Sequence, residues 1–259
     1  PTIQLDHVLR LTDGTGILQH AVYGVPNYHE GYTTDDNARA LILATLVEQA
    51  GPESYARARD LAARYLGFLN YAFDATTGRF RNFLSYDRRW CEAVSPEDPH
   101  GRALWALGVV SASSAHAELR GTANQLIGFA LRACLEFTSP RAWAFTLIGA
   151  EKYLQAFPGD RLAQEVREVL LGRLLDLYRQ NSSDQWPWFE DIVSYANAVL
   201  PHALLVAGSS MRRDEVVEVG QRTLRWLADL QRPEKDFVPI GTQGFYVRGK
   251  ERARFDQQP

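Results

Sequence analysis

The stretch Asn37–Ala50 reads NARALILATLVEQA and carries apolar residues on nearly every side of a helix. Such a helix has no wide polar face, so it must be surrounded by protein. After Gly51-Pro52 the pattern changes, because apolar residues recur at helical spacing from Tyr55 to Leu69 with charged residues between them. The two segments together predict a hairpin of one buried helix and one helix with a wet outer face.

The same order of a buried and then an amphipathic helix returns three times along the chain. Buried helices are expected over 100–117, 141–157 and 194–207, and their amphipathic partners over 118–136, 162–177 and 214–231. Pro201 is expected to kink the last buried helix, because proline removes a backbone donor and crowds the preceding turn. Such pairs are typical of a ring or solenoid of helical hairpins. The sequence therefore predicts an all-α toroid of helical hairpins, in a single domain over residues 1–259.

The loops before the buried helices vary in length, and we call them the rim loops. Three of them end in helix-start chemistry, at Thr34, Ser95 and Ser139, whose hydroxyls can accept a bond from an unpaired amide of the first turn. Two segments, Arg79–Tyr86 and Phe237–Val247, have strand-like composition and are predicted to form small β-hairpins in the rim. Function is expected in these loops, where chains tolerate variation.

Composition and motifs exclude several classes of protein. A net charge of -3 gives no field that would recruit nucleic acid or an anionic membrane. No apolar run approaches the ~18 residues of a membrane-spanning helix, and we expect a cytoplasmic protein. The sequence has no glycine-rich phosphate loop, no paired CxxC, no HExxH and no GxSxG. We therefore expect neither a cofactor nor a metal, and the candidate chemistry is that of carboxylates.

The first rim loop gathers aromatics, a histidine and carboxylates directly before a buried helix. One of Asp35 and Asp36 is expected to cap this helix or to interact with its positive end. The other carboxylate is left free, and beside aromatics that desolvate it Asp36 could act as a general acid or base. The expected substrate-binding residues of this loop are Tyr32, His29 and Arg39.

The second rim loop again mixes acids, bases and tryptophan. Asp98 and Glu92 are its candidate catalytic acids, and Trp90, His100 and Arg102 are its candidate substrate-binding residues. Each acid has a structural alternative. Asp98 follows Ser95 at the spacing of a capping box, with Asp in place of Glu, and Glu92 could form a surface salt bridge with Arg88 or Arg89.

The fourth rim loop contains the segment Gln185–Asp191, in which three large aromatics flank two acids. Trp186 and Trp188 could form a platform for a sugar, and Glu190 or Asp191 could act as the acid beside it. The structural alternative is that these aromatics fill one end of the toroid. The last residues, Phe255–Pro259, repeat the combination of an aromatic and an acid and could begin a fifth rim loop.

This pattern resembles the six-hairpin glycosidase superfamily, the (α/α)6 barrels whose active-site cleft is lined by the loops before the inner helices. It is also similar to helical domains fused to, or encoded beside, bacterial glycosyltransferases, through residues 31–41, 186–191 and 255–259. Four hairpins and the start of a fifth fall short of six, so the missing hairpins were cut away, belong to another segment, or never existed. The chain opens without Met and stops without a closing element, and we expect a fragment of a longer protein.

The resemblance implies glycoside cleavage by two carboxyl groups, of which one protonates the leaving oxygen and the other activates water or attacks directly. The leading hypothesis is a glycoside hydrolase acting on an oligosaccharide, with Asp36 and Glu190 as the pair and Asp98, Asp191 and Glu92 in reserve. The main alternative is a non-catalytic domain that binds a glycan or positions a neighbouring glycosyltransferase. A protein-binding solenoid is the third interpretation.

Overall fold

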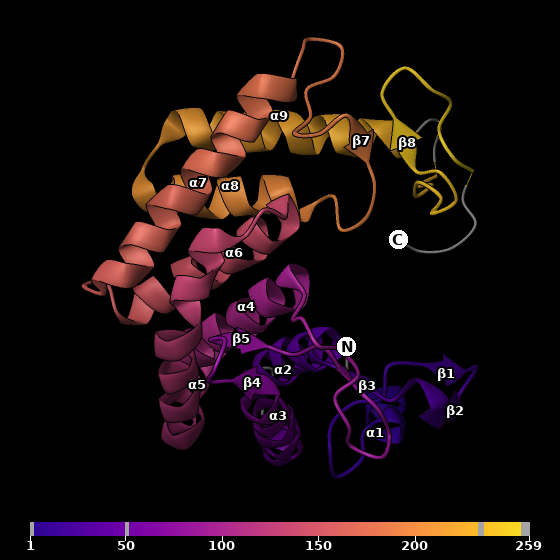
Figure 1. Ribbon diagram of the computed structural model, residues 1–259, viewed down its shortest axis with the longest axis vertical. Helices are drawn as coiled ribbons and strands as arrows, with labels where there is room; N and C mark the ends of the chain where they lie inside the picture. Colours follow the sequence, from indigo (N-terminus) through magenta and orange to yellow (C-terminus); the bar gives the residue numbers. More distant parts are fainter. Residues whose placement is uncertain (1–2, 50–51, 233–235, 255–259) are drawn as a thin grey trace. The chain divides into compact units, whose positions relative to one another are not determined.

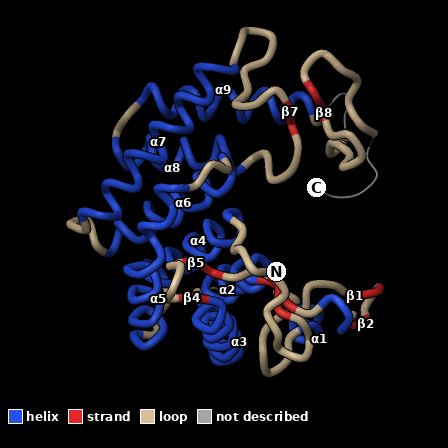
Figure 2. The backbone as a smooth tube through the Cα atoms, in the orientation of Figure 1, coloured by secondary structure: helices blue, strands red, loops and turns tan. Residues whose placement is uncertain are grey.

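The computed structural model describes residues 3–49, 52–232 and 236–254. Helices make up most of these residues, and the strands are two residues long (Figure 2). The chain forms two compact units, residues 1–166 and residues 167–259, and the boundary falls inside helix α7 (Arg161–Asn181). The predicted segment Phe255–Pro259 lies outside the described residues.

The first unit contains two of the predicted hairpins and the buried helix of a third. Its helices are α1 (Asp6–Leu11), α2 (Thr34–Glu48), α3 (Pro52–Ala72), α4 (Glu97–Ser113), α5 (Ala117–Ala130), the 3-10 helix η2 (Leu131–Glu136) and α6 (Pro140–Ala156). Figure 1 shows α2 beside α3 and α4, and α4 also packs on α5 and α6. The alternation of buried and amphipathic helices is therefore confirmed here, while the short helix α1 was not predicted.

The closest helix packing in this unit joins α4 and α6 through glycines. A Cβ atom placed on Gly108 would lie 2.2 Å from the carbonyl oxygen of Gly149. A side chain at either position would force the two backbones apart, because packed interiors leave no room for an added carbon. Leu107 and Phe145 are fully buried nearby on the same two helices.

Helix α2 is less enclosed than its composition predicts. Leu41 and Val47 are buried, but Leu43 is 37% exposed and Leu46 is 51% exposed. Within the first unit α3 and α4 pack on α2 and cover only part of its circumference. The expectation that protein surrounds every side of this helix is therefore wrong for the face that carries these two leucines.

The second unit contains the rest of α7 and the hairpin of α8 (Val199–Met211) and α9 (Asp214–Leu230). Helix α8 begins five residues later than expected, because the side chain of Asn197 binds the backbone of Ser194 in place of a helical turn. Its Oδ1 accepts from the Ser194 amide and its Nδ2 donates to the Ser194 carbonyl, each at 2.9 Å. Pro201 is consequently the third residue of α8, in the first turn, where a backbone N–H has no intrahelical acceptor. Proline costs no helical hydrogen bond at this position, so the cause of the predicted kink is absent.

The strands form four antiparallel pairs, each of two residues. The pairs are β1 (Ala21–Val22) with β2 (Val25–Pro26), β3 (Tyr32–Thr33) with β6 (Phe83–Leu84), β4 (Phe73–Asp74) with β5 (Arg79–Phe80), and β7 (Ile192–Val193) with β8 (Tyr246–Val247). Strands do occur in both segments predicted as hairpins, but they pair elsewhere: β6 pairs with the first rim loop and β8 with the fourth. The two predicted hairpins are therefore wrong in their partners.

The pairing of β3 with β6 depends on a glycine. Gly31 has a φ of 63°, a backbone conformation that residues with a Cβ atom adopt at a cost, and a Cβ atom there would lie 2.3 Å from the carbonyl oxygen of Leu84. The register places Tyr32 opposite Leu84 and Thr33 opposite Phe83. This pair therefore joins the first rim loop to the second just before α2 begins.

Helix starts follow the predicted chemistry in one case of three. Ser139 caps α6, with its hydroxyl accepting from the Ala142 amide at 3.3 Å. The cap of α2 is Thr33 in place of Thr34, whose hydroxyl donates instead to the carbonyl of Arg81. Ser95 donates to the carbonyl of Phe80, and the N-cap of α4 is Pro96, which offers no side-chain acceptor. The hydroxyls of Thr34 and Ser95 thus donate to carbonyls distant in the sequence and do not cap the helices.

Candidate functional site

Asp36 lies in the first turn of α2, three residues after the N-cap. The Thr33 hydroxyl accepts from the Asp36 amide at 3.0 Å and donates to Asp36 Oδ2 at 2.5 Å. The other carboxylate oxygen, Oδ1, accepts from Arg39 Nη2 at 2.9 Å. The cap of the helix is thus Thr33, and Asp36 takes the expected place at the positive end of the helix, where these bonds fix its carboxyl group in one orientation.

Asp35, the neighbouring carboxylate, binds two arginines. Its oxygens contact the guanidinium groups of Arg39, on the same helix, and of Arg102, on α4. The Arg102 side chain is only 14% exposed, and its guanidinium carbon lies 3.9 Å from the centroid of the Phe145 ring. Burial lowers the pKa of Arg102, and the adjacent Asp35 opposes that effect. Arg102 therefore anchors Asp35, which in turn holds Arg39 against Asp36.

The electrostatic balance at Asp36 favours the protonated form more than at an exposed aspartate. Burial raises the pKa of Asp36, the hydrogen bond from Thr33 and the charge of Arg39 lower it, and the charge of Asp35 raises it again. The net direction is upward from the ordinary value. A carboxyl group of this kind can take up or give back a proton closer to neutral pH, as general acid-base catalysis requires.

A cavity of about 320 Å³ borders Asp36 and Arg39. Its other walls are mostly apolar and include Leu11, Leu18 and Leu43. This volume lies at the lower end of the range for small-molecule sites, which are typically apolar with a few polar groups that fix orientation. Asp36 and Arg39 supply those polar groups here.

The wall opposite α2 comes from residues 8–19, which the sequence reasoning did not include in the site. Asp13 shapes this segment, because its Oδ1 accepts from the amides of Thr15 at 2.7 Å and of Gly16 at 3.3 Å. Asp-Gly followed by Thr-Gly is a turn signal that could have marked this loop. His20 follows directly, and its charge acts on Asp36.

Tyr32 and His29, both predicted to bind substrate, differ in position. Tyr32 is 1% exposed and donates from its hydroxyl to Asp13 Oδ2 at 2.5 Å. It therefore holds the Asp13 turn, and we leave it out of the proposed site. His29 lies in the 3-10 helix η1 (Tyr28–Glu30) with an exposed side chain, so its role remains a prediction.

In the second rim loop, Glu92 and Asp98 bind protein groups. Glu92 accepts the Phe83 amide at 2.7 Å and the Asn82 amide at 2.5 Å. The salt bridge suggested for Glu92 is wrong, because Arg89 pairs with Asp87. Asp98 accepts from the hydroxyl of Ser139, the cap of α6, so the capping box suggested within its own helix is also wrong.

His100 and Trp90, two predicted substrate contacts, pack against other residues of the first unit. His100 is completely buried, its Nδ1 accepts from the Phe80 amide at 3.2 Å, and its Nε2 bonds the Ala130 carbonyl at 3.1 Å. Burial lowers the pKa of His100 to about 3, so the ring stays neutral, and we leave it out of the site. Trp90 is half-buried, with ring centroids 6.1 Å from Phe68 and 5.4 Å from Tyr71.

The aromatics of the fourth rim loop are buried within the second unit. Trp188 is fully buried and Trp186 is 4% exposed. Their rings pack on Trp226 of α9 at 5.5 and 5.0 Å, and Trp186 also packs on Tyr246 of β8 at 5.1 Å. Their indole nitrogens donate to the carbonyls of Ile192 and Glu190. This geometry agrees with the structural alternative, so we leave both tryptophans out of the proposed site.

The two acids of this loop have different surroundings. Asp191 has a side chain that is 70% exposed and lies 3.4 Å from the guanidinium of Arg248. Glu190 is half-buried, and its carbonyl accepts from the Trp186 indole. Both acids belong to the second unit, whereas Asp36 belongs to the first, and their catalytic roles remain predictions.

Comparison with known proteins gives matches in structure alone. No family model matches the chain, and no curated protein matches it in sequence. A solved sugar epimerase from a ruminal bacterium matches with a TM-score of 0.73 and 12% identity, over 96% of this chain and 72% of that one. A cellobiose 2-epimerase from Spirochaeta thermophila matches with a TM-score of 0.65 and 13% identity, over 85% of this chain and 66% of that one.

The chain has the fold of these two proteins, an α/α toroid of helical hairpins. This confirms the fold that the helical pattern and the resemblance predicted. None of the helices in the described part of this toroid protein combines the length and the apolarity needed to cross a bilayer. Nor do the described residues contain three or more His, Cys, Asp or Glu side chains grouped so that they could hold a metal ion.

Proposed function

We propose that this chain is a carbohydrate-active enzyme that moves a proton at a carbon next to a sugar carbonyl, the type of step that inverts a sugar carbon in epimerisation. The observation that carries the proposal is the Asp36 carboxyl group, which borders a cavity, has a raised pKa and accepts a hydrogen bond from Arg39. The two structural neighbours named as epimerases support a sugar as the substrate.

The proposed step uses the open-chain form of a reducing sugar. The Asp36 carboxylate takes the proton from C2, and the electron pair of the broken C–H bond moves toward the carbonyl oxygen to give an enediolate. The guanidinium of Arg39 stabilises the negative charge that develops on oxygen, as preorganised charge does in such sites. The carbonyl forms again when a proton returns to C2, and return on the opposite face inverts that carbon.

His20 is the group we assign to the opposite face. It directly follows Gln19, which lines the cavity, and its charge acts on Asp36. Imidazole is the side chain that most often carries protons in enzymes. A carboxylate and an imidazole on two sides of one carbon would be enough to remove a proton from one face and deliver it to the other.

The hydrolase hypothesis has less support than epimerisation. Neither structural neighbour is named as a hydrolase, and at 12 and 13% identity the likeness shows the fold alone. The pair of Asp36 and Glu190 remains a proposal for that reaction, as does a non-catalytic role beside a glycosyltransferase. The three alternatives predict different outcomes when the same sugar is supplied.

Incubation with cellobiose in heavy water separates these alternatives. Epimerisation gives a disaccharide with an inverted C2 that carries one deuterium, hydrolysis gives two glucose molecules without deuterium on carbon, and a binding domain gives neither. We expect the first result, detected by NMR and mass spectrometry, with monosaccharides tested in parallel. Asp36→Asn should abolish the exchange, whereas Asp60→Asn, an exposed aspartate of α3, should not. Full exchange in Asp36→Asn would refute the assignment.

A further inference from the structure

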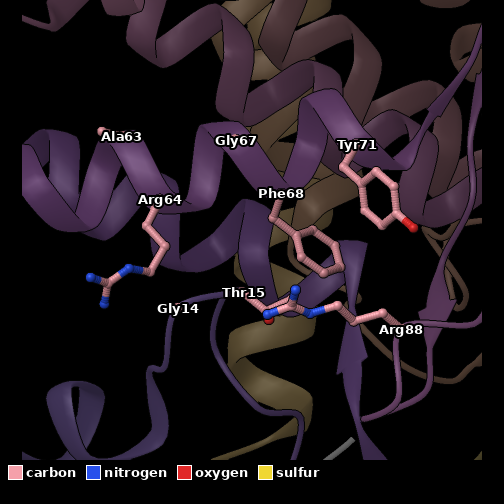
Figure 3. Close-up of a pocket in the computed structure, with 8 residues that line it drawn as sticks. All are labelled: Gly14, Thr15, Ala63, Arg64, Gly67, Phe68, Tyr71 and Arg88. Atoms are coloured by element: carbon pink, nitrogen blue, oxygen red, sulfur yellow. The ribbon is translucent and has the colours of Figure 1, made fainter.

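A second and larger cavity of the first unit lies between α3 and two loops. Its volume is about 500 Å³, well within the range of small-molecule sites. Arg64, Phe68 and Tyr71 line it from α3, and Thr15 and Arg88 line it from the loops. Figure 3 shows the Phe68 ring pointing toward Thr15 and the guanidinium of Arg88 beside Thr15, while Arg64 extends on the side of Gly14 and Tyr71 lies at the other end of the α3 face. The spacing of i, i+4 and i+7 places the three on one helix face.

The two arginines give this cavity a positive charge, and no ion pair with a described acid neutralises it. Within the described ranges, neither Arg64 nor Arg88 forms an ion pair. The nearest acids in sequence to Arg88 and to Thr15 are engaged elsewhere: Asp87 binds Arg89, and Asp13 binds Tyr32 and two backbone amides. Two guanidinium groups without acidic partners favour an anion, and guanidinium matches carboxylate and phosphate geometry in particular.

The opposite part of the wall is aromatic. Phe68 is buried, Tyr71 is 51% exposed, and Trp90 packs on both rings from behind. The indole Nε1 of Trp90 is buried and has no acceptor among the described residues. A half-exposed tyrosine ring supported in this way offers a flat apolar surface in the same cavity as the two cations.

The cavity is open because two of its wall positions are glycines. A Cβ atom on Gly14 or Gly67 would meet no atom within 4 Å. The loop that carries Gly14 and Thr15 is held by the Asp13 turn, and Arg88 has a φ of 63°, a conformation that costs a non-glycine residue energy. Both loops are therefore fixed in shape by local bonds, with the Arg88 amide donating to the Ser85 carbonyl at 2.8 Å.

We propose that this cavity binds an acidic sugar, a pyranose that carries a carboxylate or a phosphate. The anion lies between Arg64 and Arg88, and the apolar face of the ring lies on Tyr71. The requirement for an anion follows from the cavity alone, while the choice of a sugar over other acidic rings rests on the proposed function. This site differs from the Asp36 cavity, which residues 17–19 of the same loop line on their own side.

Calorimetric titration of the chain with glucuronate, glucose 6-phosphate, glucose and inorganic phosphate tests the proposal. We expect at least one acidic sugar to bind, glucose and inorganic phosphate to bind at least about tenfold more weakly, and affinity to fall between about 50 and 500 mM salt. The comparison of glucuronate with glucose 6-phosphate shows which acid is preferred. Equal binding of glucose, or no binding of either acid, would overturn the site, and equal binding of inorganic phosphate would overturn the sugar.

Substitutions of the residues that line this cavity test whether the acidic sugar binds there. Arg64→Gln and Arg88→Gln should each weaken the acidic sugar by about tenfold or more, because each removes charge-assisted hydrogen bonds. Arg57→Gln, an exposed arginine earlier on α3, is the matched control and should change nothing. Gly67→Leu should fill the cavity and abolish binding while the thermal unfolding midpoint is retained. Asp36→Asn should bind the acidic sugar as the wild type does. The binding result can therefore be interpreted even if the proposed epimerase function fails.

Discussion

Arg39 donates a hydrogen bond to Asp36 across one turn of α2, with its Nη2 2.9 Å from Asp36 Oδ1. The Arg39 side chain is 53% exposed, so solvent partly screens the effect of its charge on Asp36. Solvent does not weaken the effect of burial on the Asp36 carboxyl group in this way. The two influences on the pKa of Asp36 have opposite signs, and burial is the larger.

Arg39→Gln should shift the pH dependence of the proposed exchange reaction. Asp36 works as a base only when ionised, so activity falls as pH drops through its pKa. Removal of the arginine charge raises that pKa further, and the acid limb of the kcat/KM profile should move to higher pH. The rate at the optimum should also fall, by about tenfold or more, because charge stabilisation at oxygen is lost.

A matched control for this variant is Arg59→Gln. Arg59 forms an exposed ion pair with Glu118 that resembles the Arg39 contact in type but joins α3 to α5. Its removal should leave the pH profile unchanged. An acid limb that moved equally in both variants would show that overall charge, and not the contact with Asp36, sets the profile.

Thr33→Ala should destabilise the chain by about 1 kcal/mol, because it removes the cap of α2. The thermal unfolding midpoint is the measurement, and Thr33→Ser should restore most of the loss since serine keeps the hydroxyl. The same variant should weaken activity, because Thr33 also donates to Asp36. A Thr33→Ala chain with unchanged stability would contradict the observed cap.

His100 should make the folded state less stable in mild acid. Its pKa is lowered to about 3 by burial, so below about pH 6.5 the unfolded chain binds a proton that the folded chain does not. The free energy of unfolding should therefore fall by about 2 kcal/mol from pH 7.5 to pH 5 on account of this group. Urea unfolding at the two pH values measures it.

His100→Gln should flatten this pH dependence at a lower overall stability. The matched control is His7→Gln, because His7 is exposed and its removal should leave the slope as it is in the wild type. An equal slope in all three chains would argue against a neutral buried His100.

Gly108→Ala should destabilise the chain by about 1–3 kcal/mol, the usual cost of overpacking. The added Cβ atom would lie 2.2 Å from the Gly149 carbonyl oxygen, so α4 and α6 would have to separate. Gly121→Ala on α5 is the opposite case, since its Cβ atom would meet nothing and alanine favours the helix by up to about 1 kcal/mol. Denaturant midpoints of the two variants should therefore shift in opposite directions.

The helical hairpins were predictable because their signal is local. The apolar stripe of 214–231 and the all-round apolarity of 37–50 are visible within a few turns, and both segments are helical over most of the predicted length. The strands were not predictable in the same way. A strand of two residues such as β6 or β8 carries no information about its partner, which lies about fifty residues away for both.

The candidate site was predictable in part. The crowding of acids at the start of α2 identified Asp36, but the cavity beside it also needs residues 8–19, which contact α2 only in the folded chain. For Trp186 and Trp188, the sequence suggested a site where the structure shows buried side chains. Aromatics in a loop suggest a ligand platform, and only the folded positions of Trp226 and Tyr246 show that these rings are buried.

The two-residue ladder of β3 and β6 has a practical consequence for protein engineering. The ladder joins β3, just before Asp36, to β6, whose Phe83 amide donates to Glu92. The first two rim loops are therefore held together as one unit. Transplanting one of them into a related toroid would leave unpaired amides on the other and tilt the start of α2. Successful exchange would require moving both together, with Gly31 kept at the crossing.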